Sequence, residues 1–308
     1  MSVRLDEPKD TRADTGEALP KGEPSAGPAV SSLAGADGAV TVIEPRRGWA
    51  GIDLKELWRY RELLYFLTWR DIKIRYKQTL LGAMWAIIQP TLTMLIFTLF
   101  FGRLAKMPSD GIPYPIFVYT GLLPWTYFAN ALTSASNSLV GNARLVTKVY
   151  FPRLMIPMGA AIAGLLDLVI GGSVLGILMV YYSVIPPAAV LLFPLLVFFT
   201  FLLAVGVGLW LSALNVQFRD VKYVIPFAVQ IWLFCTPVIY PTSMLKRYEW
   251  VMNLNPMGGL IKAYRACVLG HMPLDWTALA VSGGLTIAIF LGGTFYFRRM
   301  ERTFADVV

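Results

Sequence analysis

Long apolar segments alternate with short polar ones along the chain from about residue 80 onward. Six of them are near or above the length of about 20 residues that a helix needs to cross a bilayer core about 30 Å thick. Lipid offers backbone N–H and C=O groups no hydrogen-bond partner, so an α-helix is the expected form of each span. The predicted spans are Leu81–Phe101, Ile116–Val140, Leu154–Tyr182, Ala188–Leu214, Tyr223–Pro241 and Trp276–Phe297. The pattern predicts an all-α integral membrane protein with a six-helix domain over residues 81–299 and a short C-terminal segment over residues 300–308.

The second predicted span is too polar to face lipid on all sides. Some of its polar side chains must face other helices or a wet pathway, and hydrogen bonds between helices explain several of them. They are Thr120, Asn130, Thr133, Ser134, Ser136, Asn137 and Ser138.

Asp167 is the only acid well inside a predicted span. A carboxylate within the membrane is costly and points to a functional site by default. A partner such as Asn130, or protonation, would equally satisfy it as a structural residue. Both interpretations remain open at this stage.

Two polar segments precede the first span. Residues 1–45 are rich in Pro, Gly, Ala, Ser and acids, and this composition predicts a disordered cytoplasmic tail. Residues 46–80 predict an amphipathic helix in the membrane interface, because a capping box at Asp53 and Glu56 precedes apolar residues near helical spacing among many cations. An anchor that orients the first span explains this segment, and so does a helix that also contacts lipid headgroups. The candidates for headgroup contact are Arg70, Lys73, Arg75 and Lys77.

The basic residues fall unevenly on the two sides of the predicted spans. Of the 27 Lys and Arg, four lie in the tail. A further 17 lie between the tail and the first span, in the loops after the second and fourth spans, or after the last span, whereas six lie on the other side. The positive-inside rule then places both termini in the cytoplasm, as an even number of spans requires, and predicts a multi-pass protein of the cytoplasmic (inner) membrane. The net charge of +8 is therefore interpreted as a topology signal and as contact with anionic membrane lipids, and no nucleic-acid partner is expected.

The chain offers little material for catalysis or metal binding. Cys235 and Cys267, with His271 as the single histidine, give neither a disulfide framework nor a metal-ligand spacing. The sequence has no G-x-x-x-x-G-K-[ST] phosphate loop to hold ATP. We therefore predict no catalytic residue, no metal and no cofactor in this chain.

Two loops on the predicted cytoplasmic side are candidates for contact with a partner. The loop after the second span combines charges with apolar residues that have no span to occupy, so it either docks on a partner or lies on the membrane as an interfacial turn. Its candidate residues are Arg144, Leu145, Val146, Lys148, Val149, Tyr150 and Phe151. In the loop after the fourth span, Arg219 and Asp220 form a local ion pair or face the same partner.

At these loops the chain resembles the transmembrane subunits of ABC-2-type polysaccharide exporters, the group that handles O-antigen, teichoic acid and capsule chains. The resemblance runs from about residue 60 to the C-terminus, and its motifs are specific in combination rather than singly. They are WRDIKIRYKQTLLGAMWAIIQPTLTMLIF (69–97), RLVTKVYFPRLMIPM (144–158), NVQFRDVKYVIPFAVQIW (215–232), TPVIYP (236–241) and NPMGGLIKAYRACVLG (255–270).

The resemblance implies an ATP-driven export of a lipid-linked polysaccharide through a pathway between the two subunits of a homodimer. It implies a separate ABC ATPase subunit, in two copies, that binds ATP and Mg. It further implies that the loop after the second span is a coupling helix on that ATPase, and that residues 242–272 form short re-entrant helices at the periplasmic exit. The headgroup of the lipid carrier would then enter beside the interfacial helix.

Aromatic rings suit the C–H faces of sugars, and amides and hydroxyls suit their hydroxyl groups. For any single aromatic residue, an anchor at the membrane interface or a place in the core is the favoured interpretation. The candidates for the substrate pathway are Trp85, Tyr119, Trp125, Tyr127, Phe128, Asn130, Trp232, Phe234 and Tyr240.

Three other functions compete with polysaccharide export. An ABC-2 exporter of a small molecule or lipid is the second hypothesis. A membrane glycosyltransferase is less favoured because such chemistry usually needs clustered carboxylates or a metal, and the acids outside the tail are scattered. A secondary transporter is weakened because the two triplets of spans show no convincing repeat.

Overall fold

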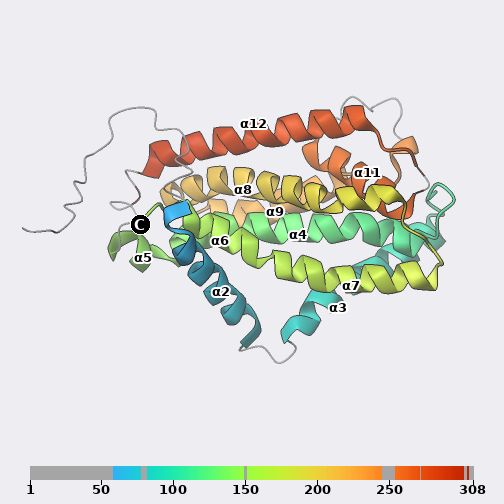
Figure 1. Ribbon diagram of the computed structural model, residues 1–308, viewed down its shortest axis with the longest axis horizontal. Coiled ribbons are helices and arrows are strands. Elements are labelled where there is room, and N and C mark those ends of the chain that lie inside the picture. Colours follow the sequence, from blue (N-terminus) through green and yellow to red (C-terminus); the bar gives the residue numbers. More distant parts are fainter. Residues whose placement is uncertain are drawn as a thin grey trace, which may run out of the picture. The chain divides into compact units, whose positions relative to one another are not determined.

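The computed structural model describes residues 58–77, 82–148, 151–244, 254–270, 272–301 and 304, and these residues form helices and turns without a strand (Figure 1). The tail over residues 1–45 and the capping box at Asp53 and Glu56 lie outside the described residues. The helices are α2 (Arg61–Lys77), α3 (Trp85–Phe97), α4 (Tyr114–Gly141), α5 (Ala143–Lys148), α6 (Met155–Ala163), α7 (Leu165–Tyr181), α8 (Phe193–Gln217), α9 (Val221–Cys235), α11 (Pro256–Leu269) and α12 (Trp276–Met300). The 3₁₀ helix η1 (Gly82–Met84) precedes α3, and the π-helix η2 (Thr98–Leu104) follows it. A second 3₁₀ helix, η3 (Ala188–Leu192), precedes α8.

Four helical stretches of the described chain are long and apolar enough to cross a bilayer. They agree with the first, third, fourth and sixth predicted spans to within a few residues, and they are Gly82–Leu104, Met155–Tyr181, Ala188–Gln217 and Trp276–Met300. The second predicted span is α4, whose 28 residues are long enough but more polar than these four. The fifth corresponds to α9, which is apolar but has 15 residues. The all-helical membrane architecture is confirmed for the described residues, and the total of six spans stays a prediction.

The polar helix α4 is the central helix of the described fold. It packs against α3, α6, α7, α8, α9 and α11, and every residue from Ile116 to Trp125 is buried. Contact with protein on nearly all sides explains why α4 tolerates hydroxyls and amides, since backbone carbonyls of its own helix accept from Thr120, Thr133 and Ser136.

The third predicted span is two helices in sequence. The backbone N–H of Gly164 bonds to Ala161 O, three residues back at 3.2 Å, and this tighter turn separates α6 from α7. A Cβ atom at Gly164 would meet the Tyr127 ring at 3.4 Å, and the Tyr127 hydroxyl donates to Ala161 O at 3.4 Å. The break therefore lies where α4 supplies both a packing surface and a hydrogen-bond donor.

The prediction that the fifth span is helical as far as Pro241 is wrong. α9 ends at Cys235, and Thr236 adopts an extended backbone. The cause is local, because Pro237 disfavours helical geometry in the residue before it. Residues 236–240 instead turn back into the protein and bury Val238 and Ile239.

The predicted re-entrant region over residues 242–272 contributes one described helix, α11, because residues 245–253 lie outside the described chain. The Asn255 side chain caps α11 by accepting from the backbone N–H of Met257 at 3.1 Å. Apart from half-buried Lys262, the residues of α11 are buried against α4, α8, α12 and η3. Its re-entrant character stays a prediction.

α8 and α12 approach each other at backbone contact. A Cβ atom on Gly293 would lie 2.3 Å from Gly206 O, and one on Gly206 would lie 2.8 Å from Phe290 Cα. Small residues allow this approach, which is the usual way that membrane helices gain packing contacts.

Candidate functional site

A half-buried polar stripe runs along the second half of α4, a helix that is otherwise almost fully buried. Its side chains recur at helical spacing and are Thr126, Asn130, Thr133, Ser134 and Asn137. No residue of α4 is charged. Since hydrocarbon does not satisfy amides and hydroxyls, this stripe is unsuited to lipid and faces either water or another protein surface.

The members of the stripe differ in how their hydrogen-bonding groups are used. Thr133 donates to Ala129 O at 2.7 Å, and Asn137 donates to Thr133 O at 2.9 Å while accepting from Asn215 of α8 at 3.0 Å. By contrast, no side-chain hydrogen bond within the described chain involves the three side chains Thr126, Asn130 and Ser134. They follow one another every fourth residue and so rise by about 6 Å per step along one helix face.

An aromatic cluster joins α4 to α9. The rings of Phe128 and Trp232 meet edge to face with centroids 5.0 Å apart, and Trp125 lies 5.5 Å from Phe128 and 6.4 Å from Trp232. Trp125 and Phe128 are buried, whereas Trp232 is half-buried and donates through Nε1 to Asn255 Oδ1 at 3.0 Å. Asn255 also caps α11, so one side chain links α9, the turn after it and α11.

The structure divides the nine predicted pathway residues into three groups. Tyr119 and Tyr127 are buried and donate to the backbone carbonyls of Gly171 and Ala161, so they act as core residues in this conformation. Trp85 and Phe234 are exposed, at 56% and 52%. Four of the remaining five belong to the stripe or to the aromatic cluster, and they are Trp125, Phe128, Asn130 and Trp232. The fifth is the half-buried Tyr240, which lies in the turn after α9 and donates through its hydroxyl to Phe234 O at 3.0 Å.

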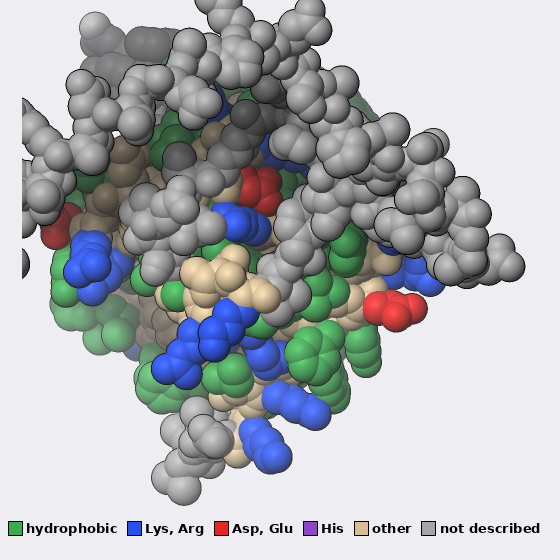
Figure 2. Space-filling view, turned by 90° about the vertical axis from the view of Figure 1, so that its left-hand side faces the viewer, with side chains coloured by type: hydrophobic (Ala, Val, Ile, Leu, Met, Phe, Trp, Pro, Cys, Tyr) green, Lys and Arg blue, Asp and Glu red, His purple; other side chains and the backbone are tan. Residues whose placement is uncertain are grey.

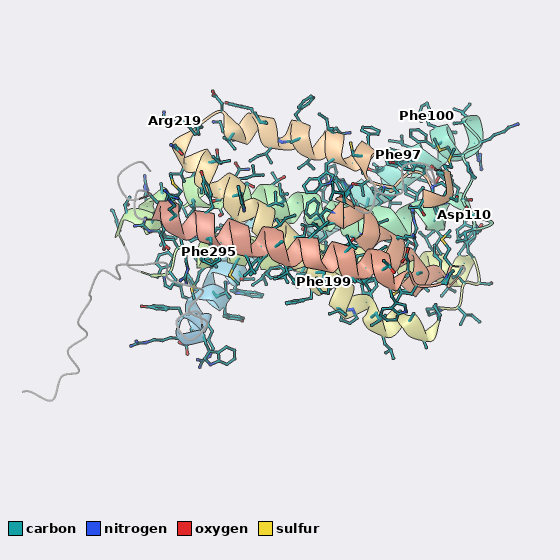
Figure 3. The ribbon with its side chains drawn as sticks, turned by 90° about the horizontal axis from the view of Figure 1, so that it is seen from above. Phe97, Phe100, Asp110, Phe199, Arg219 and Phe295 are labelled. Atoms are coloured by element: carbon teal, nitrogen blue, oxygen red, sulfur yellow. The ribbon has the colours of Figure 1, made fainter. Side chains whose placement is uncertain are left out.

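The predicted coupling residues gather at one end of the fold, where α5 and the α8–α9 turn lie (Figures 1 and 3). Arg144, Lys148, Arg219 and Asp220 are exposed there. Figure 2 looks at this end and shows many more Lys and Arg than Asp and Glu among the described side chains.

The apolar part of the predicted coupling loop needs a correction. Val146 and Phe151 are buried in the core of their own chain, at 3% and 6% exposure, and Leu145 is half-buried. They do not form the exposed apolar stripe that the loop sequence suggested, because the chain folds back and buries them. Val149 and Tyr150 lie outside the described residues. The surface offered to a partner is therefore mainly polar and basic.

The sequence hypothesis that Asn130 is the partner of Asp167 is wrong. Arg75 forms an ion pair with Asp167, and the Tyr76 hydroxyl donates to the same carboxylate, so the end of α2 is joined to the first turn of α7. Arg75 was predicted to contact headgroups, yet its guanidinium is engaged with Asp167.

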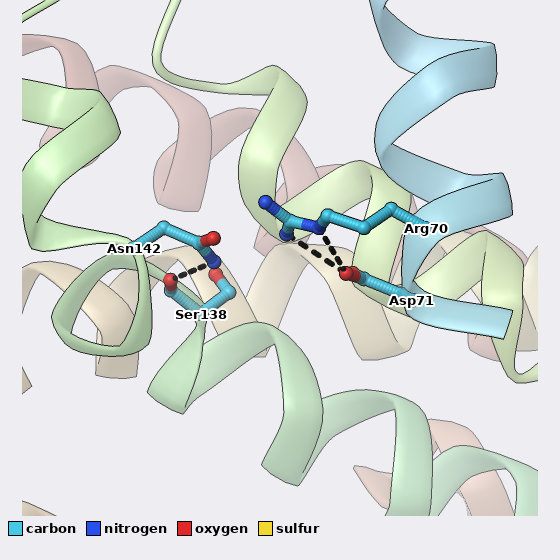
Figure 4. A network of polar contacts seen from close by, with 4 residues as sticks. All are labelled: Arg70, Asp71, Ser138 and Asn142. Atoms are coloured by element: carbon cyan, nitrogen blue, oxygen red, sulfur yellow. Dashed lines mark hydrogen bonds and ion pairs between the residues drawn. The ribbon is translucent and has the colours of Figure 1, made fainter. Parts of the chain in front are cut away.

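The other cations of α2 make local contacts. Lys73 lies over the Trp69 ring at 5.5 Å, and Lys77 is exposed. Arg70 bonds to its neighbour Asp71 at 2.8 Å; Figure 4 shows this pair together with the bond from Asn142 to Ser138 O. The exposed rings of Tyr65, Phe66 and Trp69 are followed along α2 by the exposed cations Lys73 and Lys77, and this composition suits a membrane interface.

A buried arginine at the opposite end was missed by sequence reasoning. Arg265 of α11 is 5% exposed, lies 3.7 Å from the Phe117 ring centroid and donates to Val238 O at 2.7 Å. Burial lowers the pKa of this guanidinium, and electrostatic interactions with Tyr114 and Asp110 oppose the shift. From the sequence alone, Arg265 was counted only among the six basic residues on the non-cytoplasmic side of the predicted spans. Among the described residues, no group of three His, Cys, Asp or Glu side chains is placed to hold a metal ion.

Comparison with known proteins gives a consistent result. The profile of the ABC-2 type transporter family matches residues 62–269. An O-antigen export system permease protein of Myxococcus xanthus is 29% identical over 259 residues, covering 83% of this chain and 98% of that protein. One of Klebsiella pneumoniae is 27% identical over 250 residues, covering 80% and 95%. A polysialic acid transport protein of Escherichia coli is 26% identical over 243 residues, covering 75% and 91%.

Proposed function

The chain belongs to the ABC-2 type transporter family, and from this premise we propose that it is the permease subunit of an exporter of lipid-linked polysaccharide. The observation that carries the proposal is the uncharged polar stripe on the central helix α4. Amides and hydroxyls form hydrogen bonds with the hydroxyl groups of sugars, whereas a helix that faces lipid would leave them without partners. The relatives named for O-antigen and polysialic acid transport act on polymers of this chemical class.

The proposal places the pathway between two copies of the chain. α9 lies against α4 yet leaves most of its own surface uncovered, and only Ile225 and Leu233 are buried along its 15 residues. Its exposed apolar side chains include Tyr223, Phe227 and Phe234, at 71%, 68% and 52%. A second copy placed opposite α9 would enclose the stripe on α4 and keep lipid away from it.

The proposal also requires a separate ATPase subunit, in two copies, that binds ATP and Mg. The exposed cations of α5 and the exposed Arg219 and Asp220 form a charged surface at one end of the fold, and this is where the ATPase would dock. The protein would lie in the cytoplasmic membrane with this end and both termini in the cytoplasm, because basic residues gather there.

Coupling is tested by reversing charge on α5. We expect Arg144→Glu together with Lys148→Glu to abolish co-purification of the ATPase and polymer export, while the protein remains in the membrane at its normal level. Both side chains are exposed, so the fold loses no packing. The measurement is a pull-down of the tagged chain from native membranes, followed by quantification of the bound ATPase and of surface polymer.

Two variants control this experiment. Arg103→Glu changes an exposed cation at the end of η2 and should leave ATPase binding intact. Phe151→Asp, by contrast, places a charge in the core and should lower the amount of folded protein rather than uncouple it. Normal ATPase binding by the doubly reversed variant would refute the proposed docking surface.

A further inference from the structure

Three side chains of the α4 stripe keep their hydrogen-bonding groups unused within the described chain. Thr126, Asn130 and Ser134 are half-buried on one face, while neighbouring hydroxyls at Thr120 and Ser136 donate to carbonyls of their own helix. None of their polar atoms is among those that the described chain buries without a partner, so water reaches all three side chains. Hydrocarbon would leave these groups without hydrogen bonds, so the face is suited to water and to a ligand that forms hydrogen bonds in place of water.

The chemistry of the face limits what the partner is. The three side chains offer two hydroxyls and one amide, which donate and accept hydrogen bonds without carrying charge. The helix that bears them has no charged residue, and the neighbouring α9 has one, Lys222, in its first turn. A polyanion passing along this face would lose water without gaining a compensating cation, which is costly in a region of low dielectric constant.

The spacing of the three side chains also suits a polymer. Successive members are about 6 Å apart along the helix axis, a step comparable with the length of one sugar ring. As a glycan moves along α4, each of its hydroxyl groups would pass from a hydrogen bond with one of these side chains to a hydrogen bond with the next. No single position would then hold the glycan tightly.

We infer that Thr126, Asn130 and Ser134 form a hydrogen-bonding ladder for the hydroxyl groups of an uncharged glycan, and that the exported polymer is neutral. The inference rests on the proposed function and narrows its substrate to one chemical class. It distinguishes this chain from a transporter built for a polymer with a carboxylate in every unit.

The first experiment removes the hydrogen-bonding groups of the three side chains and replaces them with apolar side chains of similar size. In the full chain with its ATPase, we expect Thr126→Val, Asn130→Leu and Ser134→Ala in combination to lower export at least about tenfold, because three hydrogen bonds of modest net strength are lost. The matched control is Thr120→Val with Ser136→Ala, on the same helix, where the hydroxyls bond to their own backbone. Membrane abundance is measured for both. Export by the triple variant within about twofold of the control would overturn the ladder, since the loss of even one hydrogen bond of ordinary net strength lowers an equilibrium constant about fivefold.

The second experiment shows what faces Asn130. An Asn130→Cys variant, in a Cys235→Ser background, should react with a water-soluble thiol reagent, and polymer held in the stalled exporter should slow the reaction. Reaction of Asn130→Cys only with a membrane-soluble reagent would show that this face of α4 meets lipid. A spontaneous disulfide between two copies, without labelling by either reagent, would show that this face of α4 packs against a second copy. Either result would overturn the inference.

The third experiment tests the charge of the substrate. In a strain that lacks this chain, we expect a lipid-linked polymer without ionised groups in its repeat unit to accumulate inside the cell. An accumulated polymer with a carboxylate in each repeat would overturn the neutral-glycan inference and leave polysaccharide export standing. If no lipid-linked polymer accumulates, the proposed function itself fails.

Discussion

At the scale of single residues, the pairing of Asp167 with Arg75 and Tyr76 indicates a structural role for an acid that lies inside a predicted membrane span. The three groups connect the last turn of α2 to the first turn of α7, next to the break at Gly164. Asp167 is 19% exposed as a side chain and Arg75 32%, so the described chain shields most of the pair. We predict that Asp167 positions α2, and with it the exposed cations at Lys73 and Lys77.

The prediction is tested by removing and then exchanging the charges. Asp167→Leu should lower stability by about 1–3 kcal/mol, because it leaves Arg75 and Tyr76 without their shared acceptor, and it should make α2 more sensitive to protease. Asp167→Asn, which still accepts hydrogen bonds, should lose less, and Arg75→Asp with Asp167→Arg should recover part of the loss. Asp71→Asn is the control, since the half-buried Asp71 pairs with its sequence neighbour Arg70 on the same helix. No recovery on exchange, with equal damage from the control, would contradict the positioning role.

At the scale of helices, Asp275 connects the start of α12 to the middle of α11. Its Oδ1 accepts from the backbone N–H of Ala278 at 3.0 Å and so caps α12, while Oδ2 pairs with Lys262 of α11 at 2.7 Å. Asp275→Asn should keep the cap and lose only the ion pair, whereas Asp275→Ala should lose both and cost about 1 kcal/mol more. Thermal unfolding of the two variants in the same detergent measures the difference. Equal stability of the two would show that the cap contributes nothing.

The same carboxylate predicts a dependence on pH. The pKa of Asp275 is lowered, first by the Ala278 N–H and then by Lys262. A carboxylate whose pKa is lower in the folded state contributes stability above its ordinary pKa of about 3.9 and loses it as the pH falls through the lowered value. Acidification below about pH 4 should therefore cost the wild type more than Asp275→Asn. The comparison is the unfolding temperature of each protein at pH 3 and pH 6.

Hydropathy and length were enough to predict elements that meet lipid. α12 was expected at Trp276–Phe297 and is found at Trp276–Met300, because only a long apolar helix satisfies its backbone in a membrane. Sequence could not show which way Val146 and Phe151 turn, since an apolar residue in a loop looks the same whether it meets a partner or its own core. Nor could it pair Asp167 with Arg75, which lies 92 positions away. The polar spacing on α4 was visible, but only the structure separates Asn130, which lacks a described partner, from Asn137, which has one.

At the scale of the whole molecule, the long helices carry the two groups of polar loops to opposite ends. α8 has 25 residues and so spans about 37 Å, more than the roughly 30 Å of a bilayer core. Figure 3 shows Arg219 at one end of the described fold and Asp110 at the other. The end with Arg219 and α5 is rich in Lys and Arg. From the positive-inside rule we propose that this end faces the cytoplasm and that the α3–α4 loop faces the periplasm.

This orientation predicts the sidedness of chemical labelling. In a Cys235→Ser background, Lys148→Cys and Arg219→Cys should react with an impermeant thiol reagent only in inside-out vesicles, because both positions are exposed at the basic end. Ile185→Cys, 86% exposed between α7 and η3, should react only in intact spheroplasts. Cys267 is buried in α11 and stays in all variants as an internal control for unfolding. Labelling of Lys148→Cys from the outside would show that the protein has the opposite orientation in the membrane. A cytoplasmic ATPase could then not dock on α5. Labelling of all three from one side would contradict the crossing of the membrane by α8, on which both the pathway and its coupling to ATP depend.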